Sequence, residues 1–141
     1  MENNYSRKII DSVSVLNLLL GEYAVVSGGA LAARGIREAQ DVDILVSEKL
    51  WFQLKEQYEV ENVDDIEKII PAKNVEIFWA GSFANLKFVN SEAPSVDDQI
   101  SRAEIINGVS FQSLQDCLWF KIRSDREKDK TDVAFIEEYL N

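Results

Sequence analysis

Hydrophobic and polar positions along the chain follow two periods, and each period predicts a different kind of element. Apolar residues three to four positions apart predict a first helix over residues 5–20, with Gly21 as its C-terminal stop. Short apolar runs predict strands over 23–27, 42–46 and 75–79. Further helical patterns are expected over 30–33, from Ser47 or Glu48 to about Tyr58, and over 95–100, 114–123 and 128–140.

Turn and cap signals complete this pattern. Asn107-Gly108 is a favoured pair for a type I′ turn and predicts a hairpin over 102–111. Ser113 followed by Asp116 is a helix start signal. Residues 62–70 show no clear pattern, and no repeat or linker interrupts the chain, so one domain is expected over 1–141. The order of helices and strands predicts an α+β fold (an α/β sandwich) with a small mixed sheet flanked by helices.

Composition narrows the chemistry. The 141 residues are 46% hydrophobic and 28% charged, which is ordinary for a globular domain with one core. No apolar run is long enough to span a membrane and no secretory leader opens the chain, so we expect a cytoplasmic protein. The chain has one cysteine and no histidine, which excludes an internal disulfide, Ser-His-Asp or Cys-His catalysis and histidine-bound zinc. Any catalysis must use carboxylates, Lys, Arg and bound metal.

The formal net charge is −10. Nucleic-acid-binding proteins usually carry basic patches, so this charge favours a cationic small molecule, or a protein with a basic face, over nucleic acid as a partner. The alternative is that the charge only keeps the protein soluble.

Two neighbouring predicted strands carry the strongest candidate chemistry. The first ends in Gly28-Gly29, and the second carries Asp41 and Asp43 on one face. Adjacent carboxylates repel each other unless a partner such as Mg²⁺ binds them. Glycines at a strand end let phosphates approach backbone amides. The glycines and the carboxylates together therefore predict a site for phosphoryl or nucleotidyl transfer. The alternatives are that Asp41 and Asp43 are solvated acids on an exposed strand and that Gly28-Gly29 is an ordinary tight turn.

In this order, Gly-Gly and Asp-apolar-Asp-apolar resemble the signature of the DNA polymerase β-type nucleotidyltransferase superfamily. The chain looks most like its compact antibiotic-modifying and toxin-type (AbiEii-like) members, which often carry Arg-x-Lys-Asp-x-x-Asp near the C-terminus. Residues 126–132 match that motif. The resemblance covers residues 23–46 and 113–140, and the middle of the chain matches by element type alone.

The resemblance implies a role for each site residue. Asp41 and Asp43 would bind two Mg²⁺ ions that bridge the triphosphate of a nucleotide. Glu76, on the strand predicted over 75–79, would be a further metal ligand or the general base, and its alternative role is an edge-strand acid. The residues implied to contact the phosphates are Ser27, Gly28, Gly29, Arg37 and Lys121.

Helix geometry adds an argument for Lys121. It lies in line with Leu114, Cys117 and Leu118 on one helical face, so its ammonium group must reach solvent or meet an anion. Arg37 would need no explanation as a surface residue.

The acids of the C-terminal motif have a structural interpretation. Asp129 and Asp132 lie one turn apart near a predicted helix start. We expect them to cap the helix and to form an ion pair with Lys121 or Arg123, rather than to act in catalysis.

The resulting hypothesis is a nucleotidyltransferase that moves NMP from an NTP, with ATP favoured, to a hydroxyl of a small molecule, protein or RNA. The last two acceptors would fit a toxin–antitoxin pair. The short chain leaves little room for an acceptor domain, so a homodimer or partner chain would complete the site. The alternative is a non-catalytic module that keeps this fold and acts as a binding or regulatory partner.

Overall fold

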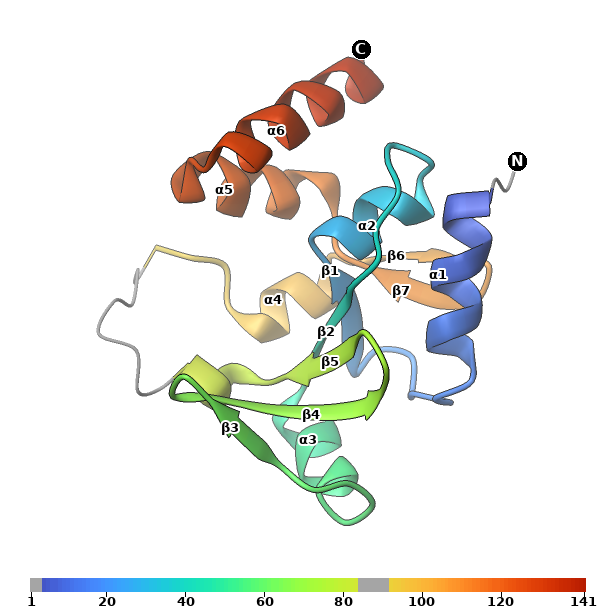
Figure 1. Ribbon diagram of the computed structural model, residues 1–141, viewed down its shortest axis with the longest axis vertical. Coiled ribbons are helices and arrows are strands. Elements are labelled where there is room, and N and C mark those ends of the chain that lie inside the picture. Colours follow the sequence, from blue (N-terminus) through green and yellow to red (C-terminus); the bar gives the residue numbers. More distant parts are fainter. Residues whose placement is uncertain (1–3, 84–91) are drawn as a thin grey trace.

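The computed structural model describes residues 4–83 and 92–141. In this part of the chain, a seven-stranded mixed sheet runs in the order β3-β4-β5-β2-β1-β7-β6 (Figure 1). Its strands are β1 (Tyr23–Val26), β2 (Val42–Val46), β3 (Glu61–Val63), β4 (Ile66–Ala72), β5 (Val75–Phe78), β6 (Glu104–Ile106) and β7 (Val109–Phe111). The helices are α1 (Asn4–Ser14), α2 (Gly28–Ala33), α3 (Glu48–Leu54), the 3₁₀-helix η1 (Ala80–Phe83), α4 (Val96–Ser101), α5 (Leu114–Ser124) and α6 (Glu127–Leu140).

Strand pairing makes the sheet mixed, as predicted. Strands β2 and β5 are parallel, as are β1 and β7, whereas β1 and β2 are antiparallel. Two antiparallel hairpins, β3–β4 and β6–β7, form the two edges. The register places Val26 of β1 beside Asp43 of β2, and Asp43 beside Glu76 of β5. These three residues therefore form one row across the centre of the sheet.

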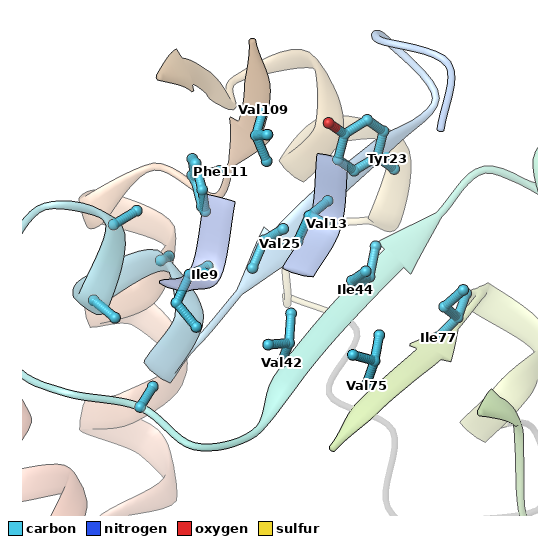
Figure 2. Close-up of a cluster of buried hydrophobic side chains, with 14 of the residues drawn as sticks. Ile9, Val13, Tyr23, Val25, Val42, Ile44, Val75, Ile77, Val109 and Phe111 are labelled. Atoms are coloured by element: carbon cyan, nitrogen blue, oxygen red, sulfur yellow. The ribbon is translucent and has the colours of Figure 1, made fainter. Parts of the chain in front are cut away.

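One face of the sheet carries the hydrophobic core. Val25, Ile44 and Ile77 point from β1, β2 and β5 toward Ile9 and Val13 of α1 (Figure 2). All five side chains are almost completely buried. Because neighbouring strand residues point to opposite sides, Val26, Asp43 and Glu76 lie on the other face. We call this second face the site face.

Helices α4, α5 and α6 surround the site face. Helix α4 contacts β1 and β2, and α5 packs against α6 (Figure 1). Ser113 accepts a hydrogen bond from the amide of Asp116 at 3.1 Å, which confirms the predicted start of α5. Among the described residues, no helix is long and apolar enough to cross a membrane.

The first helix is shorter than predicted. It ends at Ser14, and Asn17 adopts a left-handed φ of 53°. Leu19 and Leu20 are 56% and 46% exposed, so the prediction that the helix and its apolar spacing continue to residue 20 is wrong. The apolar spacing continues past Ser14, but a left-handed residue cannot continue a right-handed helix.

The two hairpins differ in how visible they are in the sequence. Asn107 and Gly108 have φ values of 49° and 82°, which confirms the predicted turn. The β3–β4 hairpin, which the sequence does not predict, turns at Asp64 and Asp65 with φ values of 53° and 66°. Type I′ geometry needs positive φ at both positions, and Asp-Asp is not the usual pair for it.

The two glycines lie inside α2, which begins at Gly28 rather than at residue 30 as predicted, and the alternative of an ordinary tight turn does not hold. Strand β1 ends at Val26, Ser27 is the residue before the helix, and Gly28 and Gly29 form its first positions. A Cβ atom on Gly29 would lie 2.7 Å from Cγ1 of Val25. This glycine therefore lets the start of α2 pack directly against β1.

We expect Gly29→Ala to lower the free energy of unfolding by about 1–2 kcal/mol, because Val25 is completely buried and has little room to move. The better helix propensity of Ala offsets only part of this cost. Gly28→Ala is the matched control: its Cβ would meet the end of the Arg37 side chain at 3.2 Å, and that side chain can shift. Urea unfolding measures both variants, and equal stabilities would contradict the close packing of Gly29.

Candidate active site

A polar cavity of about 490 Å³ lies where β1 ends and β2 begins. We call it the carboxylate cavity. Asp41 and Asp43 line it together with Ser27, Gly28 and Arg37. Asp41 precedes β2 and is exposed, whereas Asp43 lies within β2 and is half-buried. The structure thus brings five of the predicted site residues to one place.

Ser27 connects the sheet to α2 in an unusual conformation. Its φ is 57° and its ψ is −130°, a region that residues with a side chain rarely adopt. Its amide donates to Oε1 of Gln112 at 3.0 Å, and its carbonyl accepts from the amide of Ala30 at 3.0 Å. The Ala30 amide is therefore engaged within α2. Backbone strain held by long-range contacts is common at ligand sites, which is consistent with a binding role for Ser27.

Behind Ser27, Lys121 and Arg37 share one carboxylate. Nζ of Lys121 lies 2.9 Å from Oδ2 of Asp132. Arg37 donates to the two oxygens of Asp132 from Nε at 2.7 Å and from Nη2 at 2.9 Å. Lys121 is also a donor to Oγ of Ser27 at 3.4 Å. This network joins α6, α5 and the start of β2 to the end of β1.

The network confirms the ion pair predicted for Lys121. Lys121, Asp129 and Asp132 are all buried. Oδ1 of Asp129 lies 3.7 Å from Nζ of Lys121, and Oδ2 of Asp129 accepts from the amide of Arg126 at 3.2 Å at the start of α6. The anion that Lys121 meets is therefore protein carboxylate, and Asp129 has the predicted capping role.

Burial and the neighbouring charges raise the pKa of Asp43 to about 6. The main cause is burial, which disfavours the charged carboxylate, followed by repulsion from Glu76 and from Asp41. Lys68 and Lys128 act in the opposite direction. Negative charge therefore accumulates here without a fully compensating cation.

Glu76 is next to Asp43 but is not among the residues that line this cavity. It lies beside Asp43 on the site face and forms an ion pair with Lys68 of β4. Within residues 4–83 and 92–141, no group of three acidic or thiol side chains is arranged to hold a metal ion. The donor chemistry nevertheless fits Mg²⁺, since oxygen ligands and uncompensated negative charge converge at Asp41 and Asp43. A third ligand from Glu76 would come from a carboxylate whose Oε1 already contacts Lys68.

Other predicted site residues lie around rather than in the cavity. Gly29 is buried beneath it, and Lys121 reaches Ser27 from the neighbouring side. Sequence reasoning did not identify Gln40, which lies just before β2, or three residues of α6 that line the cavity, namely Lys128, Thr131 and Phe135. Lys128 belongs to the C-terminal Arg-x-Lys-Asp-x-x-Asp motif, and this motif is the sequence signal that points to it as a cavity residue.

Of the comparisons with known proteins, the one with solved structures bears on the fold. No protein-family model and no curated protein sequence matches this chain. Among solved structures, it is similar to the crystal structure of ANT(2″)-Ia, an aminoglycoside nucleotidyltransferase, in complex with adenylyl-2″-tobramycin. The TM-score is 0.51 at 17% identity, over 96% of this chain and 87% of the other. The chain therefore has a nucleotidyltransferase-like α+β fold with a mixed sheet flanked by helices.

Proposed function

We propose that this chain is a Mg²⁺-dependent nucleotidyltransferase that moves NMP from a nucleoside triphosphate to a hydroxyl group. The observation that carries the proposal is the carboxylate arrangement: Asp43 and Glu76 lie side by side on parallel strands, and Asp41 lines the same cavity as Asp43. This arrangement occurs in a fold shared with a protein solved with an adenylylated product. ATP is the favoured triphosphate, and the antibiotic-modifying or AbiEii-like toxin-type subclass stays a prediction.

Each group in the cavity has a distinct task in this proposal. Asp41 and Asp43 would hold Mg²⁺, which when bound neutralises charge on the phosphates. Ser27 and Gly28 would contact the triphosphate at the start of α2. Lys128 lines the same cavity from α6 and adds positive charge facing Asp43. Arg37 and Lys121 are held by Asp132, so they position the phosphate-binding backbone as well as adding charge.

The transfer itself is an in-line displacement. The acceptor oxygen forms a bond to the α-phosphorus while the bond between that phosphorus and the bridging oxygen of the β-phosphate breaks, and pyrophosphate leaves. The proton of the acceptor hydroxyl passes to the carboxylate of Glu76. For this, Glu76 must exchange its contact with Lys68 for one with the acceptor.

We expect Glu76→Gln to slow NMP transfer at least about tenfold while nucleotide affinity stays within about twofold, because the amide cannot accept the proton. Glu67→Gln is the matched control: Glu67 lies on β4 and accepts a hydrogen bond from Trp79 at 3.0 Å. Single-turnover rates and equilibrium binding give the two quantities. Equal transfer rates in wild type and Glu76→Gln would exclude Glu76 as the base.

The net charge of the chain bears on which acceptor receives the NMP group. We propose a cationic small molecule or a protein with a basic face, in keeping with the net charge of −10. A second copy of the chain or a partner chain would supply the rest of the acceptor site. Incubation with α-³²P-labelled triphosphates and separate pools of aminoglycosides, basic proteins and RNA tests this. Mg²⁺-dependent label in the aminoglycoside or basic-protein pool supports the proposal. Label in RNA alone contradicts it, and so does the absence of label from all three pools although nucleotide is bound.

One observation favours a second candidate, a non-catalytic binding module. The side chains of Glu76, Arg37 and Lys121 are all engaged by protein partners, namely Lys68 and Asp132. A site that no longer uses nucleotide would show such internal pairing. Under this alternative, neither Mg²⁺ nor any triphosphate would bind to wild type or to Asp43→Asn.

A further inference from the structure

A second cavity, of about 460 Å³, lies on the site face next to the carboxylate cavity. We call it the apolar cavity. Its floor includes Val26 and Leu45, which flank Asp43 on β1 and β2. Its walls come from η1, α4 and α5, and the two cavities share Ser27. A ligand anchored at Ser27 and Asp43 could therefore extend directly into it.

The apolar cavity differs from its neighbour in charge. No carboxylate contributes to its described lining, and Lys121 is the one charged residue there. Lys121 is already bound to Asp132 at 2.9 Å. A cationic group placed here would lose its hydration without gaining a carboxylate partner. The cavity therefore disfavours a cationic acceptor and suits an uncharged, apolar group.

The polar side chains of the lining are also engaged. Gln112 accepts from the amide of Ser27 at 3.0 Å and donates to Oε1 of Gln99 at 2.9 Å. Gln99 donates in turn to the carbonyl of Pro94 at 3.1 Å. Ser95 accepts from the amide of Asp98 at 3.0 Å as the cap of α4. Recognition in this cavity must therefore rest mainly on shape and stacking.

Two partly exposed aromatic rings supply stacking surfaces. Phe83 of η1 and Phe120 of α5 both line the cavity, and each is 36% exposed. Aromatic rings bind the flat faces of heterocycles with little dependence on their hydrogen-bonding edges.

We propose that the apolar cavity receives the heterocyclic base of the nucleotide whose triphosphate occupies the carboxylate cavity. The inference rests on the proposed function and adds where the base lies and how it is recognised. Since stacking rather than hydrogen bonding dominates, the preference for ATP over the other common nucleotides is small. A cationic acceptor must then approach from the carboxylate side, near Asp41.

Calorimetric titration of Mg·ATP and of Mg·tripolyphosphate into the same protein separates the base from the phosphates. Phe120→Ala removes one stacking surface at a partly exposed position, and Ile122→Ala is the matched control on α5, 51% exposed and outside the cavity lining. We expect Phe120→Ala to weaken Mg·ATP binding about tenfold and Mg·tripolyphosphate binding less than about twofold. Ile122→Ala should change neither.

Each other outcome has a definite meaning. If both ligands bind and Phe120→Ala leaves their affinity ratio unchanged, the base lies elsewhere and the inference is overturned. If Mg·ATP binds wild type no more tightly than Mg·tripolyphosphate, the protein does not recognise the base at all, which also overturns it. If neither ligand binds wild type, the proposed function itself fails, and the inference fails with it.

Discussion

Asp43→Asn raises the free energy of unfolding of the metal-free protein by about 1–3 kcal/mol near neutral pH, and it slows NMP transfer by at least about a thousandfold. The stabilisation follows from the pKa of Asp43, which burial and the charges of Glu76 and Asp41 raise to about 6. Each pKa unit corresponds to about 1.4 kcal/mol, and partial exposure of the side chain reduces the total. A residue that destabilises the empty protein but binds a ligand is typical of a functional site.

The pH dependence has a definite sign. The folded pKa of Asp43 lies above its ordinary value, so the folded state binds this proton more tightly than the unfolded state does. The resulting stability is complete below about pH 4 and is lost as the pH rises through about 6. Asn carries no charge in this range. The gain from Asp43→Asn is therefore largest above about pH 6 and disappears at about pH 4.

Urea unfolding across this pH range, with EDTA present, measures the stability, and single-turnover assays measure transfer. Asp11→Asn, at an exposed position of α1, is the matched control and should have little effect on either quantity. If Asp43→Asn instead lowered the free energy of unfolding, Asp43 would be a structural hydrogen-bonding residue, and not a metal ligand whose negative charge lacks a partner in the metal-free protein.

Asp132→Ala lowers the free energy of unfolding by about 3 kcal/mol, because it removes the main partner of a buried cation. Lys121 is 6% exposed and would keep only Asp129, whose Oδ1 lies 3.7 Å away. Arg37 is less affected, since its side chain is 32% exposed and can reach water. The loss should also disturb Ser27, to which Lys121 donates.

Lys130→Ala is the control for ion pairing in general. Its partners are Asp125 at 3.9 Å and Glu127 at 3.5 Å, and all three side chains are exposed. Pairs of this kind contribute at most about 0.5 kcal/mol. Urea unfolding of both variants distinguishes them, and equal effects would mean that the buried network contributes no more than a surface ion pair.

Acid should weaken the same network. Burial tends to raise the pKa values of Asp129 and Asp132, but hydrogen bonds from Arg126 and Ser124 to Asp129, and from Arg37 and Lys121 to Asp132, outweigh it. The pKa of Asp129 falls to about 2, and that of Asp132 lies below its ordinary range. Their contribution to stability is therefore present above about pH 4 and is lost as the pH falls toward 2.

Local signals predicted much of the fold. The strands predicted over 42–46 and 75–79, the second of which ends one residue earlier at Phe78, depend on a few neighbouring residues each. The same is true of the cap at Ser113 and the turn at Asn107-Gly108. The early end of α1 at Ser14 and the Asp64-Asp65 turn depend on backbone conformations that these residue types seldom adopt. Sequence patterns therefore could not predict them.

In the candidate site, too, local sequence predicts some positions, whereas the long-range contacts appear only in the folded chain. The positions of Asp41 and Asp43 follow from one strand, and the structure places both at one cavity. The partners of Arg37 and Glu76 do not follow from local sequence. Arg37 binds Asp132, which is 95 residues away, and Glu76 binds Lys68 across β4 and β5. Such pairs depend on the strand order and on the placement of α6, which only the folded chain defines.

A thermal-shift titration of wild type and Asp43→Asn tests most directly whether the chain binds nucleotides through Mg²⁺ at Asp43. The ligands are ATP, CTP, GTP and UTP, each with and without Mg²⁺. Ligand binding to the native state raises the melting temperature, and the stabilisation grows with the ligand concentration relative to the dissociation constant. We predict that the nucleotides raise the melting temperature of wild type in a Mg²⁺-dependent manner. They should not raise that of Asp43→Asn, although this variant melts at a higher temperature without ligand. No rise with any nucleotide in wild type, or an equal rise in both proteins, would contradict this prediction.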